Sequence, residues 1–508
     1  MSESPTSERP QPPPKVLTGI PGFDTLTYGG LPANRSTLVA GSSGSGKTIF
    51  AVQFLACGIT EFDEAGVFVT FEESPDDIRR NVASFGWDIA AWERAGKWAF
   101  VDASPNPEEE IVEAGDYDLG GLMVRIRAAV ERLRAKRLAV DSLSAVFSQF
   151  QDASVVRSEL FRIARAARGM GVTAVLTAER TEEYGAVGRY GVEEFLADNV
   201  VVLRNVLDDE QRRRTLEMLK FRGTDHQKGE HPFVIEGKRG VVVIPLTGIP
   251  LEQRSSNVRV TSGNGELDHM CGGGFFRDSV VLVSGATGTG KTLTVTHFLS
   301  GGARQGDRGL LFGYEESREQ LVRNALGWGV DFESMELDGK LLLDCEYPEA
   351  RGLQDHLLRI KRAIEEFRPR RVVIDSLSAL ERVGPPKAFR QMVIDLTSFI
   401  KQKEITGLFT NTTPTLVGGT SVTEAHISSL TDSIILLRYV EMFGEMHRGL
   451  MVLKMRGSPH DKEIRELTID GSGMHLGDPF RTVSGILSGN PVHSREELAR
   501  LEGLFPQE

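Results

Sequence analysis

The sequence is poor in the residues and runs that mark secreted, metal-binding and membrane proteins. Its three cysteines, Cys57, Cys271 and Cys345, lie far apart and match neither a disulfide framework nor a metal-ligand spacing. No apolar run reaches the roughly 18 residues of a membrane helix, and the N-terminus lacks the apolar core of a signal peptide. We therefore expect a protein of the reducing cytoplasm that does not associate with a membrane.

Positive charge is scarce as well. The chain has 59 Lys and Arg residues against 71 Asp and Glu residues, which gives a formal net charge of −12. Proteins that coat nucleic acid need Lys and Arg against the phosphates, so this balance argues against nucleic acid as the main partner. A local basic patch stays open as an alternative.

The sequence does contain one set of motifs that occurs twice in the same order. The pairs, in chain order, are GSSGSGKT (41–48) and GATGTGKT (285–292), FEES (71–74) and YEES (314–317), AVDSLSA (139–145) and VIDSLSA (373–379), and KFRGTDH (220–226) and KMRGSPH (454–460). The second copy follows the first by 244 residues at the first pair and by 234 at the last two. A duplicated domain with trimmed loops explains this pattern.

The 508 residues are therefore expected to form two domains with short additions. The boundary is predicted in PLTGIPLEQRSSN (245–257), where the β-rich run GVVVIP gives way to turn-forming and polar residues. The predicted parts are a disordered leader at 1–15, a first domain at 16–246, a linker at 247–257, a second domain at 258–480 and a tail at 481–508. The leader is rich in Pro, Ser and Glu and cannot bury enough surface to offset the entropy of ordering it.

The fold class follows from how the apolar residues are spaced in each half. Short apolar runs such as STLVAG and RLAVDS alternate with amphipathic stretches such as DLGGLMVRIRAAVERLRAKR. This alternation predicts an α/β domain in which long helices flank a mostly parallel central sheet.

Both copies carry a phosphate-binding loop that matches G-x-x-x-x-G-K-[ST] in full, follows a strand-like run and opens a helical pattern. Glycines let backbone N–H groups surround the β- and γ-phosphates, Lys neutralises charge and Thr can bind Mg²⁺. A glycine-rich turn with a solvated lysine is the alternative, and the agreement of strand, loop and helix in both copies argues against it. The predicted nucleotide-binding residues are Gly44, Ser45, Gly46, Lys47 and Thr48 in the first copy, and Gly288, Thr289, Gly290, Lys291 and Thr292 in the second.

An aspartate ends a later apolar run in each half. Asp141 and Asp375 are each followed by a serine, as expected for a carboxylate that orders Mg²⁺ at the carboxyl edge of a sheet together with Thr48 or Thr292. Capping of the following helix is the alternative role of these aspartates.

A pair of glutamates ends another predicted strand, 24 or 25 residues after each loop lysine. The pairs are Glu72 with Glu73, and Glu315 with Glu316. A carboxylate beside the γ-phosphate could orient and deprotonate the attacking group, whether water or a hydroxyl. Two solvated glutamates at a strand end are the alternative, which their recurrence in both copies argues against.

Two cations alternate with apolar residues in the last motif of each half. They are Lys220 and Arg222 in LEMLKFRG, and Lys454 and Arg456 in LMVLKMRG, so each pair is expected on one strand face. They could lie on an exposed edge strand and prevent it from pairing with another chain. Alternatively they could reach a nucleotide held by an adjacent subunit, as an arginine finger does.

Together these features resemble the KaiC family of circadian clock ATPases and autokinases, within the broader RecA-like group. The likeness runs from about Leu17 to Ser488 and is carried by both phosphate loops, FEES and YEES, both DSLSA segments, KFRGTDH, KMRGSPH and TEAHISSLTDSIILLRY. The resemblance implies tandem RecA-like P-loop NTPase domains in a homohexameric double ring, with ATP and Mg²⁺ bound between neighbouring subunits in both tiers.

The resemblance also implies a division of labour between the halves. The first looks like a slow ATPase, and the second like an autokinase and autophosphatase that phosphorylates two adjacent hydroxyls across the subunit interface. The matching residues here are Ser428 and Ser429; the usual family pair is Ser then Thr, so Ser429 departs from it but keeps the hydroxyl. Arg382 and Arg390 are family-like candidates for that interface, with helix-surface solvation as the alternative.

The repeat supplies an internal comparison for the two serines. Aligning LADNVVVLR with LTDSIILLR places Ser428 opposite Glu194 and Ser429 opposite Phe195, so only the second half has hydroxyls there. The first site could then deliver its γ-phosphoryl group only to water, whereas the second could transfer it to protein. A helix cap or a turn hydrogen bond is the alternative role of such a serine pair.

Other functions stay open. One is a signalling ATPase of the same family that barely phosphorylates itself. Another is a DNA-binding RecA-like ATPase, against which the acidic balance and the lack of a zinc-binding cysteine cluster argue. A third is a nucleotide-gated scaffold, for which two glutamate pairs have no chemical use. Clock partners similar to KaiB and KaiA are implied by the resemblance alone, facing residues 106–119 and 481–508; neither segment has a motif that carries this assignment.

Overall fold

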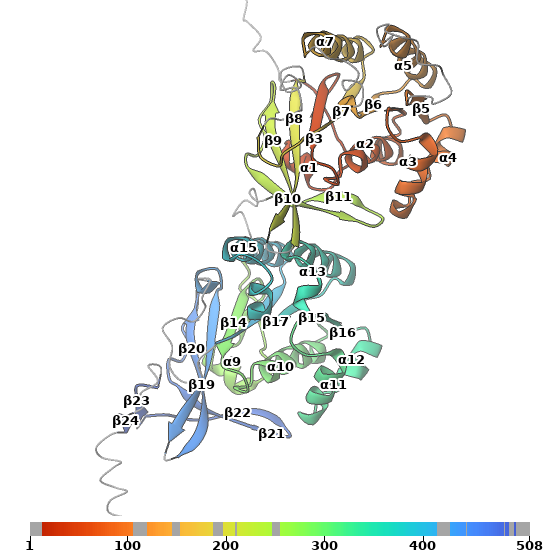
Figure 1. The fold of residues 1–508 in the computed structure, drawn as a ribbon. Coiled ribbons are helices and arrows are strands. Elements are labelled where there is room, and N and C mark those ends of the chain that lie inside the picture. Colours follow the sequence, from red (N-terminus) through yellow and green to blue (C-terminus); the bar gives the residue numbers. More distant parts are fainter. Residues whose placement is uncertain are drawn as a thin grey trace, which may run out of the picture. The chain divides into compact units, whose positions relative to one another are not determined.

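The computed structural model describes residues 13–104, 119–144, 153–185, 197–208, 211–245, 255–413, 427–442, 444–481, 483–486 and 492–493. The chain divides into two compact units, Met1–Gly248 and Ile249–Glu508. Figure 1 shows that each unit has helices packed around its own sheet. Within the described residues, no helix is both long and apolar enough to cross a membrane.

The first unit is built on a nine-stranded sheet in the order β11-β10-β9-β8-β3-β7-β6-β4-β5. The strands from β8 to β5 in this order run parallel, and β9, β10 and β11 are antiparallel. Its strands are β1 (Lys15–Val16), β2 (Leu31–Pro32), β3 (Ser36–Gly41), β4 (Gly66–Thr70), β5 (Trp98–Asp102), β6 (Arg137–Asp141), β7 (Thr173–Glu179), β8 (Asn199–Asp208), β9 (Gln211–Phe221), β10 (Glu230–Glu236) and β11 (Gly240–Val243). Its helices are α1 (Phe23–Leu26), α2 (Lys47–Phe62), α3 (Pro75–Val82), η1 (Ala83–Phe85), α4 (Ile89–Arg94), α5 (Leu119–Leu133) and α7 (Ala153–Gly169).

The second unit repeats this plan in a nine-stranded sheet of order β16-β15-β17-β18-β14-β19-β20-β21-β22. The strands from β16 to β19 run parallel, and β20, β21 and β22 are antiparallel. Its strands are β12 (Arg259–Val260), β13 (Phe275–Phe276), β14 (Val280–Gly285), β15 (Gly309–Gly313), β16 (Leu341–Cys345), β17 (Arg371–Asp375), β18 (Thr406–Thr412), β19 (Ser433–Met442), β20 (Glu445–Met455), β21 (Arg465–Asp470), β22 (Gly473–Pro479), β23 (Val483–Ser484) and β24 (Val492–His493). Its helices are α9 (Gly265–Met270), α10 (Lys291–Arg304), α11 (Arg318–Gly327), α12 (Phe332–Leu337), η2 (Pro348–Ala350), α13 (Leu353–Phe367), α14 (Leu377–Glu381), α15 (Pro386–Gln402) and η3 (Ile427–Ser429).

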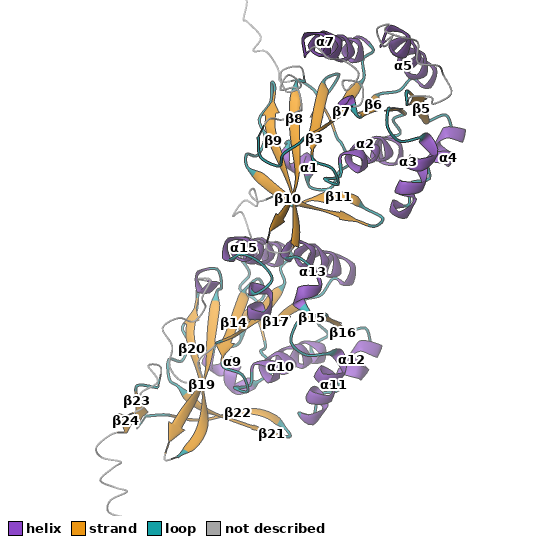
Figure 2. Cartoon of the chain, viewed as in Figure 1, coloured by secondary structure: helices purple, strands orange, loops and turns teal. Residues whose placement is uncertain are grey.

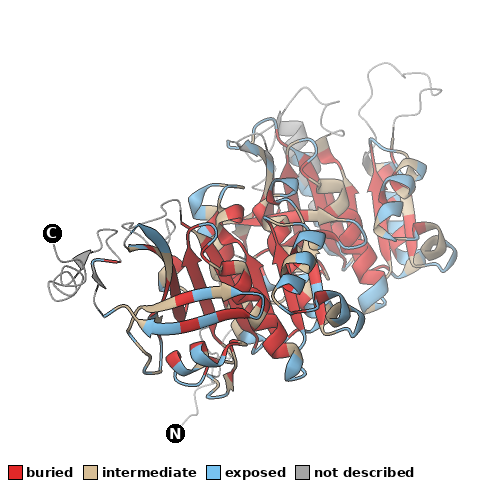
Figure 3. Cartoon of the chain, turned by 90° about the horizontal axis from the view of Figure 1, so that it is seen from below, coloured by how far each residue is buried: buried red, intermediate tan, exposed pale blue. Residues whose placement is uncertain are grey.

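The predicted α/β class, with helices flanking a mostly parallel sheet, is confirmed in both units. The strand that leads into each phosphate loop is buried along its whole length, as expected for a parallel strand covered on both faces. In the first unit α2 packs on one face through Phe50 and Phe54, and α5 packs on the other through Leu122 and Ile126 (Figure 2). Figure 3 shows the buried residues concentrated along the strands and the exposed ones on the outer helix faces.

A buried arginine begins one central strand of each sheet. Arg137 and Arg371 are both 1% exposed. Arg137 donates to the carbonyl oxygens of Leu17 at 2.8 Å and Phe54 at 2.9 Å, and to Glu64 Oε2 at 2.7 Å. Arg371 makes the equivalent bonds to Thr261 O, Phe298 O and Asp307. Each arginine thus ties the start of its domain and its first long helix to the sheet.

A helix glycine makes room for each of these arginines. A Cβ added at Gly58 in α2 would lie 2.5 Å from Arg137 Cδ, and one added at Gly302 in α10 would lie 2.3 Å from Arg371 Nε. Glycine costs about 1 kcal/mol relative to alanine inside a helix. Its presence at both places is explained by the space that the guanidinium group takes.

Candidate active sites

The two phosphate loops lie where the first central strand of each sheet meets its first long helix. Lys291 is buried, and its Nζ donates to the carbonyl oxygens of Gly285 and Ala286 at 3.0 Å. Lys47 Nζ donates in the same way to Ser42 O at 2.9 Å. Burial lowers the pKa of both lysines, while nearby carboxylates act in the opposite direction. Each loop therefore directs a partly desolvated ammonium group into the space that its backbone encloses.

Glycine is required at the last loop position before each helix. Gly46 and Gly290 have φ angles of 98° and 107°, which a residue with a Cβ adopts only under strain. A Cβ at Gly46 would in addition lie 2.8 Å from Ile235 Cδ1. The loop conformation that directs backbone N–H groups toward phosphates thus depends on these glycines.

Substituting Gly46→Ala is expected to weaken nucleotide binding by the first domain about tenfold, because the loop must shift to relieve a strain of 1 to 3 kcal/mol, roughly. Titration of a fluorescent ATP analogue into a chain whose second loop carries Lys291→Ala measures this. Gly237→Ala is the control, since nothing lies within 4 Å of a Cβ added there. Unchanged affinity in Gly46→Ala would show that the loop conformation is not needed for binding.

The aspartate that ends the strand after α13 faces the loop threonine in the second unit. Asp375 Oδ2 lies 3.3 Å from Thr292 Oγ1, and Thr410 Oγ1 donates to the other carboxylate oxygen. Burial raises the pKa of Asp375 to about 6. Asp141 ends the equivalent strand of the first unit and accepts a hydrogen bond from Thr177. A carboxylate and a hydroxyl are the hard oxygen ligands that suit Mg²⁺.

Each glutamate pair begins two residues after the end of β4 or β15, and equivalent residues bind it in both units. Ser142 Oγ donates to Glu72 at 2.9 Å, and Ser376 Oγ donates to Glu315 at 2.6 Å. The amide of an asparagine in the next helix binds the second glutamate: Asn81 Nδ2 lies 2.8 Å from Glu73, and Asn324 Nδ2 lies 2.7 Å from Glu316. These partners hold the two carboxylates of a pair apart.

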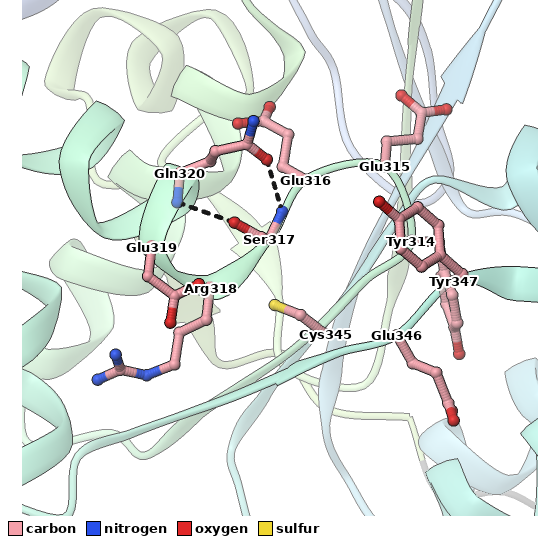
Figure 4. A pocket seen from close by; sticks show the side chains of 10 residues that line it. All are labelled: Tyr314, Glu315, Glu316, Ser317, Arg318, Glu319, Gln320, Cys345, Glu346 and Tyr347. Atoms are coloured by element: carbon pink, nitrogen blue, oxygen red, sulfur yellow. Dashed lines mark hydrogen bonds between the residues drawn. The ribbon is translucent and has the colours of Figure 1, made fainter.

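In the second unit, Glu316 Oε1 lies 3.4 Å from Thr292 Oγ1, so this pair reaches the phosphate loop. Figure 4 shows the carboxylates of Glu315 and Glu316 on different sides of the chain, with Ser317 and Gln320 forming the capping box of α11 beneath them. A cavity of about 250 Å³ opens beside the pair. It is lined by Tyr314, Glu315, Glu316, Ser317, Arg318, Glu319, Gln320, Cys345, Glu346 and Tyr347.

The predicted serines lie at the opposite ends of the strands from the phosphate loop. Ser428 is partly exposed and Ser429 exposed, in the short helix η3 that precedes β19. Strand β19 is parallel to β14, and Ser433 pairs with Val281 near the start of β14. The serines therefore lie at the amino ends of the parallel strands, whereas the phosphate loop follows their carboxyl ends. The aligned residues Glu194 and Phe195 of the first half lie outside the described residues.

The predicted cations lie at this same amino edge. Lys454 Nζ donates to the carbonyl oxygens of Ser428 at 2.9 Å and Thr431 at 2.7 Å, and Arg456 Nη2 donates to that of Ser429 at 2.8 Å. In the first unit, Lys220 Nζ donates to Ala197 O at 2.9 Å. Arg222 follows β9 directly, and its backbone N–H donates to Asp198 O. Lys454 and Arg456 thus support the backbone that carries the serines.

Some positions of the sites could have been found by a closer comparison of the two halves. Three kinds of residue are identical in both copies: the asparagines that bind the second glutamate (Asn81, Asn324), the serines that follow the strand-end aspartate (Ser142, Ser376), and the threonines that donate to this aspartate (Thr177, Thr410). The predicted interface residues Arg382 and Arg390 are both exposed. Arg382 caps the end of α14, and Arg390 lies in α15.

Among the described residues, no cluster of three or more His, Cys, Asp or Glu side chains is arranged to hold a metal ion.

Comparison with known proteins gives matches along nearly the whole chain. The family model described as the KaiC ATPase matches residues 16–248 and again residues 260–479. The circadian clock protein KaiC3 of Synechocystis sp. is 63% identical over 494 residues, covering 97% of this chain and 98% of its own length. The circadian clock oscillator protein KaiC of Thermostichus vulcanus is 56% identical over 502 residues, covering 98% and 96%. That of Synechococcus elongatus is 55% identical over 492 residues, covering 96% and 94%.

Proposed function

Because the chain belongs to the KaiC family of ATPases, we propose that it is a timing or signalling ATPase whose second domain is also an autokinase and autophosphatase acting on Ser428 and Ser429. The first domain hydrolyses ATP. The chain works as a homohexameric double ring in the cytoplasm, with clock proteins of the KaiB and KaiA kinds as partners and no role in coating nucleic acid. The relatives named as clock proteins support the circadian setting.

The observation that carries the proposal is the placement of the serines and the phosphate loop on opposite edges of one sheet. Strand β14 has six residues, and a strand rises about 3.3 Å per residue, so the edges lie about 20 Å apart. Transfer needs reacting atoms about 3 to 3.5 Å apart. The serines of one second domain therefore receive phosphate from the nucleotide of another copy.

A head-to-tail interface brings these edges together. In such an interface, one copy presents its carboxyl edge and the next its amino edge, and repetition closes a ring when the rotation allows. The amino edge carries Lys454 and Arg456 together with the serines. These cations would meet the negative charge of the neighbouring nucleotide at the point where the serines meet its terminal phosphate.

The chain's own residues supply the steps of the reaction. The loop backbone and Lys291 hold the phosphates, and a glutamate of the 315–316 pair accepts the proton as a seryl oxygen attacks the γ-phosphorus and the bond to ADP breaks. In the first domain, Lys47 and the 72–73 pair act in the same way on water. Thr48 with Asp141, and Thr292 with Asp375, would hold Mg²⁺, which neutralises charge on the β- and γ-phosphates.

Intact-protein mass spectrometry after incubation with ATP and Mg²⁺ tests the autokinase. The parent chain is expected to gain up to two phosphates, and the Ser428→Ala, Ser429→Ala double variant none. Ser472→Ala removes an exposed turn serine elsewhere in the domain and should leave phosphorylation unchanged. Phosphate uptake by the double variant would refute the assignment. A parent that hydrolyses ATP but gains no mass would favour the signalling ATPase without autophosphorylation.

A further inference from the structure

One strand end differs in chemistry between two otherwise matched sites. Strand β7 lies between β3, which leads into the first phosphate loop, and β6, which ends in Asp141. Its last residue, Glu179, pairs with Gly41 at the start of the loop. The carboxyl end of β7 therefore lies between the phosphate cradle and the metal carboxylate, where the terminal phosphate of a bound nucleotide is expected.

The equivalent position in the second unit is Thr412. Strand β18 lies between β14 and β17, and Thr412 pairs with Gly285. The backbone at both positions is fixed by the same partner, because the N–H of Glu179 donates to Ser144 Oγ at 2.7 Å and that of Thr412 to Ser378 Oγ at 3.0 Å. The backbone N–H is thus bound in the same way at both positions, whereas the side chains differ.

The two side chains differ in exposure as well as in chemistry. The Glu179 side chain is exposed. Thr412 Oγ1 is buried and has no hydrogen-bond partner among the described residues. Because Thr412 pairs with Gly285 next to the phosphate loop, its hydroxyl is free to bind a group that enters with the nucleotide.

The segment that follows Glu179 is anchored on the phosphate loop itself. Glu183 accepts hydrogen bonds from Ser42 Oγ at 2.5 Å and from the backbone N–H of Asn205 at 3.0 Å. In the second copy, Ala286 replaces Ser42, and residues 412–420 contain no acidic residue. Glu179 and Glu183 therefore have no acidic counterpart at the aligned positions of the second copy.

We propose that this position selects the acceptor of the γ-phosphoryl group, with Glu179 selecting water in the first domain and Thr412 admitting a seryl hydroxyl in the second. The inference rests on the proposed division between hydrolysis and autophosphorylation. It makes Glu179 a further positioning residue for hydrolysis, beside the Glu72–Glu73 pair.

The selection follows from the number of hydrogens that each acceptor carries. A water molecule has two, so it can donate one to the catalytic glutamate and the other to Glu179 while its lone pair faces phosphorus. A seryl hydroxyl has one, which the catalytic glutamate takes, so a second carboxylate would face only its oxygen and methylene group. Thr412 removes that repulsion, and its hydroxyl can donate to the seryl oxygen or to a phosphate oxygen.

The first arm of the test isolates hydrolysis by the first domain in a full-length chain carrying Lys291→Ala. Adding Glu179→Thr is expected to lower kcat for phosphate release at least tenfold with little change in KM, since the nucleotide is still held by the loop. Glu179→Gln, which keeps an acceptor oxygen without the charge, should lose less. Glu182→Thr is the matched control on the same segment and should keep the parent rate. A Glu179→Thr rate within twofold of the parent would overturn the role of Glu179.

The second arm uses the reverse exchange in a full-length chain carrying Lys47→Ala. Adding Thr412→Glu is expected to lower phosphate incorporation into the protein at least tenfold while phosphate release by the second domain persists or rises. Undiminished incorporation would overturn the selection. A parent that takes up no phosphate would refute the autokinase proposal instead, and the Glu179 arm would still decide the role of that residue. Binding of a fluorescent ATP analogue shows that each variant is folded.

Discussion

Replacing Glu72 and Glu73 together by glutamine is expected to lower ATP hydrolysis by the first domain by about 10² to 10⁴, the range for loss of a general base. The variant keeps the phosphate loop and Lys47, so nucleotide binding should persist. The hydrogen bonds to Ser142 and Asn81 show that both side chains are already positioned at the strand end. Phosphate release from a chain whose second loop carries Lys291→Ala measures the effect.

The matched control is another pair of consecutive glutamates, Glu365 and Glu366, which are exposed on α13 of the second unit. Its double glutamine variant makes the same change of charge away from both sites and should retain the parent rate. If the Glu72→Gln, Glu73→Gln variant also retains a rate within threefold of the parent, the pair does not provide the base. If the rate falls as expected, the single variants Glu72→Gln and Glu73→Gln show which carboxylate is responsible, since Ser142 binds Glu72 and Asn81 binds Glu73.

The largest expected effect on stability comes from Arg137→Met. The change removes a buried cation but leaves Glu64 and the carbonyl oxygens of Leu17 and Phe54 without it. Removing one partner of a buried pair costs about 3 to 5 kcal/mol. Denaturant unfolding followed by tryptophan fluorescence reports mainly on the first unit, since three of the four tryptophans, Trp87, Trp92 and Trp98, lie there.

Arg80→Met is the control for this prediction. Arg80 is 76% exposed at its side chain and pairs with Asp77 one turn away on α3, so its loss should cost below about 0.5 kcal/mol. Both variants must be compared at one nucleotide concentration, because ligand binding shifts apparent stability. A loss below about 1 kcal/mol in Arg137→Met would mean that water or relaxed neighbours satisfy the exposed carbonyl groups.

The sequence predicted the fold, and it marked the candidate site positions, because the duplication tests each motif against its copy. A phosphate loop, a strand-end aspartate and a glutamate pair each depend on local residue order, and each recurred in the same order. The repeat alignment also marked Ser428 and Ser429 as present in one half only. The assignment of these residues to catalysis, metal binding and phosphorylation remains a prediction that the experiments above address.

Other features depend on residues far apart in the chain and could not be predicted in this way. In the sequence, Arg137 and Arg371 look like ordinary polar residues at the start of the strands RLAVD and RVVID. Only the fold brings carbonyl oxygens and a helix glycine next to each of them. The placement of the serines at the amino ends of the strands also depends on β19 being parallel to β14, which only the fold shows. The difference between Glu179 and Thr412 gains meaning only once both are placed beside a phosphate loop.

The separation of the serines from their own phosphate loop has a consequence for how phosphorylation responds to assembly. A second domain in which donor and acceptor lie on opposite edges cannot label itself, so the rate of labelling should depend on chain concentration and fall on dilution below the assembly threshold. In mixed assemblies, a chain with a dead second loop would still be labelled by an intact neighbour, and a chain without the serines would still serve as donor. Under the proposed function, the phosphorylation state is then shared by all chains of an assembly, and exchange of chains between assemblies would redistribute it.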